Sequence, residues 1–459
     1  MFTIMLRLRT VHLNFVWLVM HAASLLQVCA IINSARASSL LGSIDISVLP
    51  STGSDSGCLT NTTTPCRTLA GAVAAASAQP QPTAVFISLD GPIFTACQLL
   101  LVNAAVTIQA ASNGHASILI DCTACDVCLN ITDHVATSTL VGLHFMNSRA
   151  AGLSYSGQLE MTNVSFSNHS AQLIVQRNST NAPGKFSCTG CSFTHNTLLS
   201  VDPAIVLLGG DILLISCNIS DNVLLSSPSL LSIDTALSTA VESMQLTLLT
   251  VERNVLVTTS ANLILFRNTP GISVSNCSFS HNQAASIVAS HLLMDRRVPY
   301  DFSLTNSVFD SNNVMQNELS VVRIVSSAPH AIVSAMVSGC DFVSNRGGNG
   351  SGLSISAPLA FSAIIRQCNF VNNTATRNGG AIALYSYTSS DLETFTDVSV
   401  SIANVSFLNN IAGQSGGAMF ITGFYGSASF VNLTCFNNAA TAGVGGVIAA
   451  SALDSAQFE

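Results

Sequence analysis

Charged residues are scarce in this 459-residue chain. They make up 8% of it, with 15 lysines and arginines against 23 aspartates and glutamates, and the net charge is −8. A nucleic-acid surface needs clustered lysines and arginines, and the sequence has no basic patch with interleaved aromatic residues, so we expect no nucleic-acid partner. After residue 40 the sequence also lacks any uninterrupted apolar run of about 18 residues, so we expect no transmembrane helix after the N-terminal segment.

Catalytic groupings are missing as well. Glycosidases need two carboxylates at a defined separation, and the carboxylates here are scattered without an Asp-Asp pair. Asp133-His134 and Asp295-Arg296-Arg297 are the most suggestive groups, and both are better interpreted as loop residues. The sequence therefore predicts no catalytic residue, no cofactor-binding residue and no metal site.

What the chain does contain is a nine-residue pattern that recurs about ten times between residues 161 and 438. Its first and fourth positions are apolar, its sixth is usually aromatic, and its ninth is Asn in nearly every copy. Val274, Cys277, Phe279 and Asn282 form one such copy. Successive copies are about 30 residues apart, which predicts a solenoid with one copy in each coil.

The spacing within the pattern predicts a short strand followed by a turn. Its fourth and sixth positions are two apart, so on a strand they face the interior together. The Asn then lies at the turn, where it tolerates left-handed backbone geometry and bonds local backbone. Stacked in successive coils, such amides also bond one another along a ladder. The predicted structural ladder comprises Phe193, Asn196, Asn222, Phe279, Asn282, Phe309, Asn312, Phe342, Asn345, Phe370, Asn373, Phe407 and Asn410.

A second strand follows in the later copies. Glycine pairs at 379–380, 416–417 and 445–446 each precede an alternating apolar stretch. We therefore predict an all-β fold, a right-handed single-stranded parallel β-helix. The runner-up is a leucine-rich-repeat-like solenoid, whose core pattern is similar but whose repeats usually run 20–29 residues with a regular return segment.

The two ends of the chain predict further segments. Residues 1–37 are typical of a secretory signal peptide, with Arg7 and Arg9 before an apolar stretch and a small-x-small cleavage site; the alternative is an uncleaved signal anchor. Residues 38–83 are expected to form an N-terminal cap with a short Ala-rich helix. Residues 84–459 form the predicted β-helix, and because no closing cap follows, we expect the chain to be cut short or part of a longer protein.

Cysteine usage favours an oxidising compartment, because 13 of the 14 cysteines follow the signal segment. The CxxCxxC run at 122–128 has metal-ligand spacing but is better interpreted as disulfide-forming. Cysteines at the same strand position of successive coils lie close enough to bond, or they form a column of free buried thiols. The disulfide candidates are Cys58 with Cys66, Cys191 with Cys217, and Cys340 with Cys368.

Eleven N-x-S/T sequons predict a glycoprotein. The candidate sites are Asn61, Asn130, Asn163, Asn168, Asn178, Asn218, Asn276, Asn349, Asn372, Asn404 and Asn432.

Two sets of residues resemble known families. The paired motifs F-x-x-N and G-G-A-[I/L/V], at 370–373 with 379–382 and at 407–410 with 416–419, resemble the repeats of chlamydial polymorphic outer membrane proteins. The segment from Gly53 to Ala70 is similar to the start of pectin-lyase-like right-handed β-helices. The resemblance to the chlamydial repeats implies a β-helix displayed at a surface, often in adhesion.

The functional hypothesis is a non-enzymatic, secreted or cell-surface β-helix that serves as an adhesion, structural or glycan-interaction module. Its expected partners are glycans or proteins of the cell surface or extracellular matrix. The alternative is a polysaccharide lyase or glycoside hydrolase whose site lies in the variable loops. The two differ in whether Asp, Arg or His residues from neighbouring coils converge in one groove.

Overall fold

The structure is a computed structural model. It describes residues 43–55, 58, 64–77, 84–91, 93–95, 99–101, 105–111, 118–123, 125, 127–131, 137–177, 184–235, 243–293, 300–316, 318–328, 332–357, 360–386, 398–423, 426–451 and 455–459. The predicted signal peptide at residues 1–37 lies outside these ranges. None of the helices in the described ranges is both long and apolar enough to cross a bilayer.

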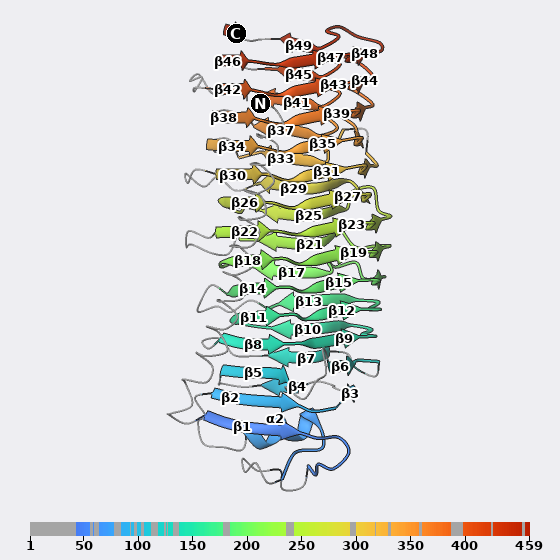
Figure 1. Ribbon diagram of the computed structural model, residues 1–459, viewed down its shortest axis with the longest axis vertical. Coiled ribbons are helices and arrows are strands. Elements are labelled where there is room, and N and C mark those ends of the chain that lie inside the picture. The colour runs from blue at the N-terminus through green and yellow to red at the C-terminus, as the bar shows by residue number, and fades with distance from the viewer. Residues whose placement is uncertain are drawn as a thin grey trace, which may run out of the picture.

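The chain winds into a right-handed parallel β-helix, as the repeat predicted (Figure 1). Strands of successive coils pair in parallel to form four long sheets, here called A, B, C and D in the order given below. One coil passes through A, B, D and C in turn, and among the described residues the first D strand is β16. No regular helical return segment is present in the described coils, which excludes the leucine-rich alternative.

Sheet A comprises β1 (Ser43–Val48), β2 (Ala84–Leu89), β5 (Ala105–Ala110), β8 (Thr137–Val141), β11 (Gln158–Thr162), β14 (Lys185–Thr189), β18 (Ile212–Ile215), β22 (Ser243–Thr247), β26 (Gly271–Ser275), β30 (Tyr300–Thr305), β34 (Ile332–Ser338), β38 (Ala360–Arg366), β42 (Val398–Ala403), β46 (Gly426–Val431) and β50 (Ser455–Phe458). Sheet B comprises β3 (Ile93–Thr95), β6 (Ile118–Asp121), β9 (Leu143–Met146), β12 (Ser165–Ser167), β15 (Ser192–Thr194), β19 (Asn218–Ser220), β23 (Thr250–Glu252), β27 (Ser278–Ser280), β31 (Val308–Asp310), β35 (Asp341–Val343), β39 (Asn369–Val371), β43 (Ser406–Leu408) and β47 (Thr434–Phe436).

Sheet C comprises β4 (Leu99–Leu101), β7 (Val127–Ile131), β10 (Ala151–Tyr155), β13 (Gln172–Gln176), β17 (Ile205–Leu208), β21 (Ser229–Asp234), β25 (Asn262–Arg267), β29 (Ser286–Leu292), β33 (Val322–Ser326), β37 (Leu353–Ala357), β41 (Ile382–Ser386), β45 (Met419–Thr422) and β49 (Ile448–Ser451). Sheet D comprises β16 (Thr197–Leu198), β20 (Val223–Leu224), β24 (Val255–Leu256), β28 (Gln283–Ala284), β32 (Asn313–Val314), β36 (Arg346–Gly347), β40 (Thr374–Ala375), β44 (Ile411–Ala412) and β48 (Ala439–Ala440).

Aromatic rings of sheet B stack in register inside the helix. Phe279 pairs with Phe309 and Phe309 with Phe342, and their ring centroids lie 4.7 Å and 4.9 Å apart. The column continues through Phe370 to Phe407 at 4.7 Å and 5.3 Å. These spacings match the separation of neighbouring strands. The predicted interior column is therefore confirmed, and aliphatic residues replace the ring in the coils of β19 and β23.

Two corners of each coil turn through left-handed residues, and one of them corrects an expectation. We expected the ladder Asn itself to adopt positive φ, but the residue before it does so: His281 before Asn282 (φ 55°) and Ser311 before Asn312 (φ 53°). Because the chain turns one residue earlier, the Asn side chain points into the interior, where it is fully buried. The other corner, between sheets A and B, uses residues such as Asn276 (φ 53°).

Sheet C departs from the simple alternation that the glycine motif predicted. At the start of its strands two successive backbone N–H groups donate to one carbonyl: those of Ile287 and Val288 both bond the oxygen of Val321, at 3.0 Å each. This arrangement is a β-bulge, and it places two consecutive apolar side chains in the core. The bulge shifts the alternation of the residues that follow it, and the first partly exposed residue of β29 is His291.

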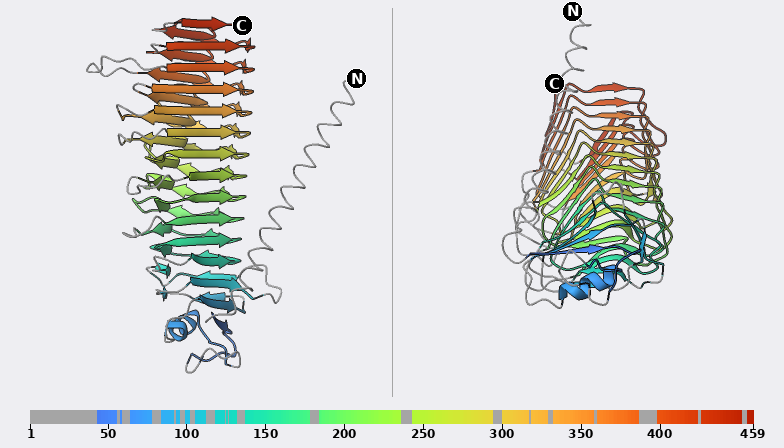
Figure 2. Two further views of the ribbon diagram at one scale, coloured as in Figure 1. Left: turned by 90° about the vertical axis from the view of Figure 1, so that its left-hand side faces the viewer. Right: turned by 60° about the horizontal axis from the view of Figure 1, so that its bottom comes forward.

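The helix α2 (Leu69–Ser77) lies at the N-terminal end of the stack, against β1 and β2 (Figures 1 and 2). Thr68 caps it, because the Thr68 hydroxyl accepts the backbone N–H of Gly71 at 2.9 Å. The Asp55 carboxylate accepts the N–H groups of Arg67 and Thr68, both at 2.9 Å. The strand β1 pairs with β2, so sheet A begins within the segment expected to be only a cap.

Candidate functional site

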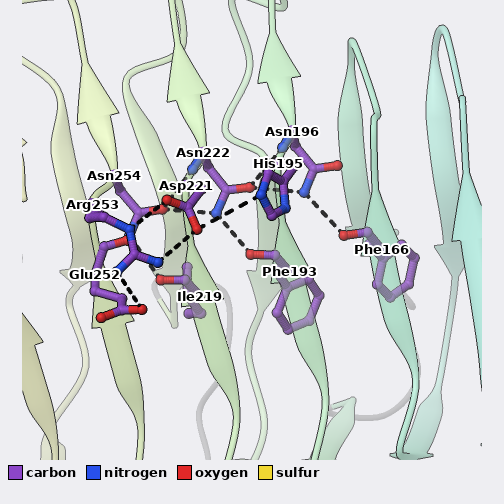
Figure 3. A network of polar contacts seen from close by, with 10 residues as sticks. All are labelled: Phe166, Phe193, His195, Asn196, Ile219, Asp221, Asn222, Glu252, Arg253 and Asn254. Carbon is purple, nitrogen blue, oxygen red and sulfur yellow. Dashed lines mark hydrogen bonds and ion pairs between the residues drawn. The ribbon is translucent and has the colours of Figure 1, made fainter.

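The ladder of asparagines is the most regular polar feature of the molecule (Figure 3). At Asn312, Nδ2 donates to the carbonyl of Phe279 (2.9 Å) and to Oδ1 of Asn345 (3.1 Å). Its Oδ1 accepts both the backbone N–H and the Nδ2 of Asn282, at 3.1 Å and 3.0 Å. All four positions of the amide are thus used within the core, so the ladder holds neighbouring coils together.

The same amide contacts recur through the predicted ladder, include Asn254, and reach one coil beyond its C-terminal end. They run through Asn196, Asn222, Asn254, Asn282, Asn312, Asn345, Asn373, Asn410 and Asn438. These asparagines are therefore structural, and those from Asn196 to Asn410 are buried away from any external ligand.

His169 occupies the ladder position of the preceding coil. Its backbone N–H donates to Oδ1 of Asn196 at 2.9 Å. The ring nitrogen Nδ1 accepts the N–H of Ser148 at 3.2 Å, and Nε2 lies 3.0 Å from the carbonyl of Phe145. A neutral imidazole with its hydrogen on Nε2 thus reproduces the acceptor and donor of an asparagine amide. Burial lowers the pKa of His169 to about 4.

Acid is expected to weaken the fold through His169. The pKa is lower in the folded chain than the ordinary 6.5, so the unfolded chain binds the proton first as pH falls. The contribution of neutral His169 is complete above about pH 6.5 and decreases toward pH 4, by roughly 2.5 kcal/mol at pH 4.5. Urea unfolding of the chain and of His169→Asn at pH 7.5 and 4.5 measures this. Equal losses of stability in both proteins would contradict it.

A charged network lies outside the ladder, on the corner between sheets B and D (Figure 3). Arg253 Nε and Nη2 bond the two carboxylate oxygens of Asp221 at 2.7 Å and 3.0 Å, and Arg253 Nη1 lies 2.7 Å from Glu252. His195 Nε2 is 4.0 Å from the same Asp221 carboxylate. Hydrogen bonding to Arg253 lowers the pKa of Asp221. The carboxylates are paired with arginine, so the network joins coils and offers no general acid.

The disulfide candidates have mixed outcomes. Cys58 is bonded to Cys66, as predicted. Cys191 is bonded to Cys188 of its own coil, so its predicted bond to Cys217 is wrong. The reason is local: Cys188 and Cys191 flank one corner and both point inward, whereas Cys217 donates its thiol to the carbonyl of Cys188 at 3.3 Å.

Cys340 and Cys368 are free buried thiols, which matches the alternative of a thiol column and not the predicted bond. Each thiol donates to a carbonyl of the preceding coil, at 3.6 Å from Leu304 and 3.7 Å from Val337. The CxxCxxC run contains a disulfide between Cys122 and Cys128.

Among the described residues the one group of sulfur, imidazole or carboxylate ligands close enough for a metal is Cys188, Cys191 and Cys217. Two of these sulfurs are joined in a disulfide, which leaves a single buried thiol, so the group is a poor metal site.

The sequons divide by position. Six lie exposed at the corners that flank sheet B: Asn163, Asn168, Asn276, Asn372, Asn404 and Asn432. Asn218 and Asn349 are half-buried on sheet B and after β36, and Asn130 is half-buried on sheet C. Asn61 and Asn178 lie outside the described residues. Glycans on the exposed six would therefore cover the edges of sheet B and leave the outer face of sheet C open.

An open groove of about 560 Å³ lies on the outer face of sheet C, across β7, β10 and β13. Arg149 and Arg177 are both exposed at its lining, and neither forms an ion pair with the described residues. Gln172 and Ser200 add polar groups, and the half-exposed Leu199 adds an apolar edge. Three coils thus bring together residues that are far apart in the sequence.

The floor of the groove holds a buried hydroxyl without a partner. Ser154 lines it, and the buried Oγ of Ser154 has no hydrogen-bond partner in the structure. Buried polar atoms are nearly always hydrogen-bonded, so this hydroxyl marks a place where a ligand or water supplies the missing bond.

Sequence reasoning missed this site. Arginines are few, and two of them fall next to C strands, which was a usable signal. The early C strands lack the glycine motif, however, so their register could not be assigned. Asp133, His134 and residues 295–297, considered as catalytic groups above, lie outside the described residues.

Comparison with known proteins finds neither a matching family model nor a matching curated protein. Solved structures show a distant likeness. A GH136 lacto-N-biosidase from Eubacterium ramulus has a TM-score of 0.36 at 11% identity, over 81% of this chain and 69% of that one. A polygalacturonase from Erwinia carotovora ssp. carotovora has 0.36 at 9%, over 89% and 96%.

The catalytic domain of a GH87 α-1,3-glucanase in complex with tetrasaccharides has a TM-score of 0.39 at 11% identity, over 84% of this chain and 67% of that one. All three names are those of carbohydrate-active enzymes. Likeness at this level does not carry substrate or activity over to this chain, and none of these three structures is a chlamydial outer membrane protein.

Proposed function

We propose that this protein is an extracellular β-helix that binds an acidic polysaccharide in the groove on sheet C. The observation that carries the proposal is the pair of exposed guanidiniums, Arg149 and Arg177, at a groove lined by hydroxyl and amide groups. Arginine binds carboxylate or sulfate groups through two parallel hydrogen bonds. Serine and glutamine side chains suit the hydroxyl groups of a sugar.

The surroundings support a glycan as the ligand. The chain has a net charge of −8, so two arginines at one groove give a local charge opposite to that of the whole molecule. The exposed sequons lie beside sheet B, and glycans there would leave the groove accessible. The disulfides and the predicted signal peptide favour an extracellular setting.

The proposal is for binding without cleavage. Hydrolysis of a glycosidic bond needs two carboxylic acids facing each other across the bond. Arginines from neighbouring coils do converge in the groove, as the enzyme alternative required, but its described lining contains no aspartate or glutamate. Adhesion or a structural role at the cell surface follows from binding alone, as the sequence hypothesis held, and enzymatic cleavage is the outcome that the test must exclude.

Titration calorimetry with polygalacturonate and with fully methyl-esterified pectin tests the proposal. The acidic polymer is expected to bind, and the double variant Arg149→Gln/Arg177→Gln to bind it at least about tenfold more weakly, because charge-assisted hydrogen bonds contribute about 1.5–3 kcal/mol each. The control is Arg366→Gln, which removes an exposed arginine from sheet A.

Two results would overturn the proposal. One is equal affinity for the acidic and the esterified polymer, since that would make the arginines irrelevant. The other is reproducible release of reducing or unsaturated ends during the incubation, which would show that the groove cleaves its ligand.

A further inference from the structure

A second basic cluster lies farther along the outer face of sheet C. Arg267 ends β25, His291 lies level with it on β29, and Arg323 lies on β33, level with Ala289. The guanidinium Nη1 of Arg323 is 3.2 Å from Nε2 of His291. Arg267 is exposed, and the other two side chains are half-buried. Three consecutive coils therefore gather two guanidiniums and an imidazole at one place.

The imidazole is neutral in this arrangement. A guanidinium donates and never accepts, so Nε2 of His291 is the acceptor and carries no hydrogen. Burial, with Arg323 and Arg267 nearby, lowers the pKa of His291 to about 4. The described charges that face it are Arg267 on β25 and Arg323 on β33; Asp234 on β21 lies beside Arg267, one coil farther away.

The cluster and the groove share one row of the sheet. Val175 is level with Val206, so Arg177, two residues on, is level with Leu208. The row continues through Asp234 and Arg267. Neighbouring strands are about 4.8 Å apart, so three steps from Arg177 to Arg267 span roughly 14 Å.

We propose that Arg267, His291 and Arg323 form a second anion subsite, which holds a further carboxylate or sulfate group of the same acidic polysaccharide and binds it more tightly as the solution becomes acidic. The proposal rests on the proposed function. One polymer that runs from the groove to the cluster engages both, and the second contact is intramolecular once the first has formed. The gain in affinity from the second contact therefore depends on the length of the polysaccharide.

Acid acts through His291. Protonation of Nε2 breaks its hydrogen bond with Arg323 and adds a third positive charge to the cluster. Because the coupling is reciprocal, a bound anion must also favour protonation of the imidazole. Tighter binding under mild acid is therefore a direct consequence of the cluster geometry.

The test uses the full chain, with galacturonate oligomers that are either too short or long enough to span the two subsites. The double variant Arg267→Gln/Arg323→Gln is expected to bind long oligomers about tenfold more weakly and the disaccharide unchanged. For the unaltered chain, affinity for long oligomers should rise at least about threefold from pH 7.5 to pH 5.5, where sugar carboxylates stay ionised. His291→Gln should abolish that rise, because a glutamine side chain takes up no proton in this pH range.

The outcomes separate the two proposals. If Arg149→Gln/Arg177→Gln weakens all lengths while Arg267→Gln/Arg323→Gln changes nothing, the second subsite is refuted and the groove stands. If the cluster variant weakens short and long oligomers equally, the cluster is not a separate subsite. If neither pair of substitutions affects binding, the proposed function itself fails.

Discussion

Replacing Phe342 with alanine is expected to lower the free energy of unfolding by about 3–5 kcal/mol. The ring is fully buried between Phe309 and Phe370, with centroids 4.9 Å and 4.7 Å away and planes within 5° of parallel. Its removal leaves a cavity that the stacked coils cannot close, because their spacing is set by backbone hydrogen bonds. Two stacked aromatic pairs are lost as well.

Urea unfolding measures the loss, and hydrogen exchange locates it. In a solenoid each coil contacts only its neighbours, so protection should fall in β31, β35 and β39 and persist at both ends. The matched control is Phe436→Ala, since Phe436 is 68% exposed in the last B strand and its removal should cost little. A loss below about 1 kcal/mol for Phe342→Ala would show that the column does not support the fold.

Replacing Asn312 with alanine is expected to cost at least about 3 kcal/mol, because the substitution orphans three buried groups at about 1–3 kcal/mol each. The carbonyl of Phe279 loses a donor, and the backbone N–H and Nδ2 of Asn282 lose an acceptor. None of these groups can reach water. The interior of the coil therefore keeps unpaired polar atoms that the unfolded chain would hydrate.

Two further variants make this prediction specific. Asn313→Ala changes the exposed neighbour on β32 and should leave stability within about 0.5 kcal/mol. Asn312→His should lose less stability than Asn312→Ala, because His169 already fills a ladder position with an imidazole. If Asn312→Ala and Asn313→Ala unfold at the same urea concentration, the hydrogen bonds of the ladder do not stabilise the fold.

The repeat made the interior predictable. The aromatic ring and the Asn keep the same three-residue spacing within each copy, as in Phe279 with Asn282, and a side chain that recurs in every coil must meet its own kind above and below. The thiol column and the Cys191 pairing were less predictable, because Cys191 had two neighbours at bonding distance and the choice depended on the corner geometry. We also expected the left-handed residue one position too late, at the ladder Asn and not before it, because this choice depends on corner geometry as well.

The sequence by itself determined the β-helix and its inward columns, because these depend on periodicity and composition. The tertiary structure alone decided the outer face of sheet C. Arg149 and Arg177 meet across coils, and Arg267, His291 and Arg323 come from three successive strands. Their meeting depends on loop lengths and on the bulge that sets the register of each C strand, and neither leaves a periodic trace in the sequence.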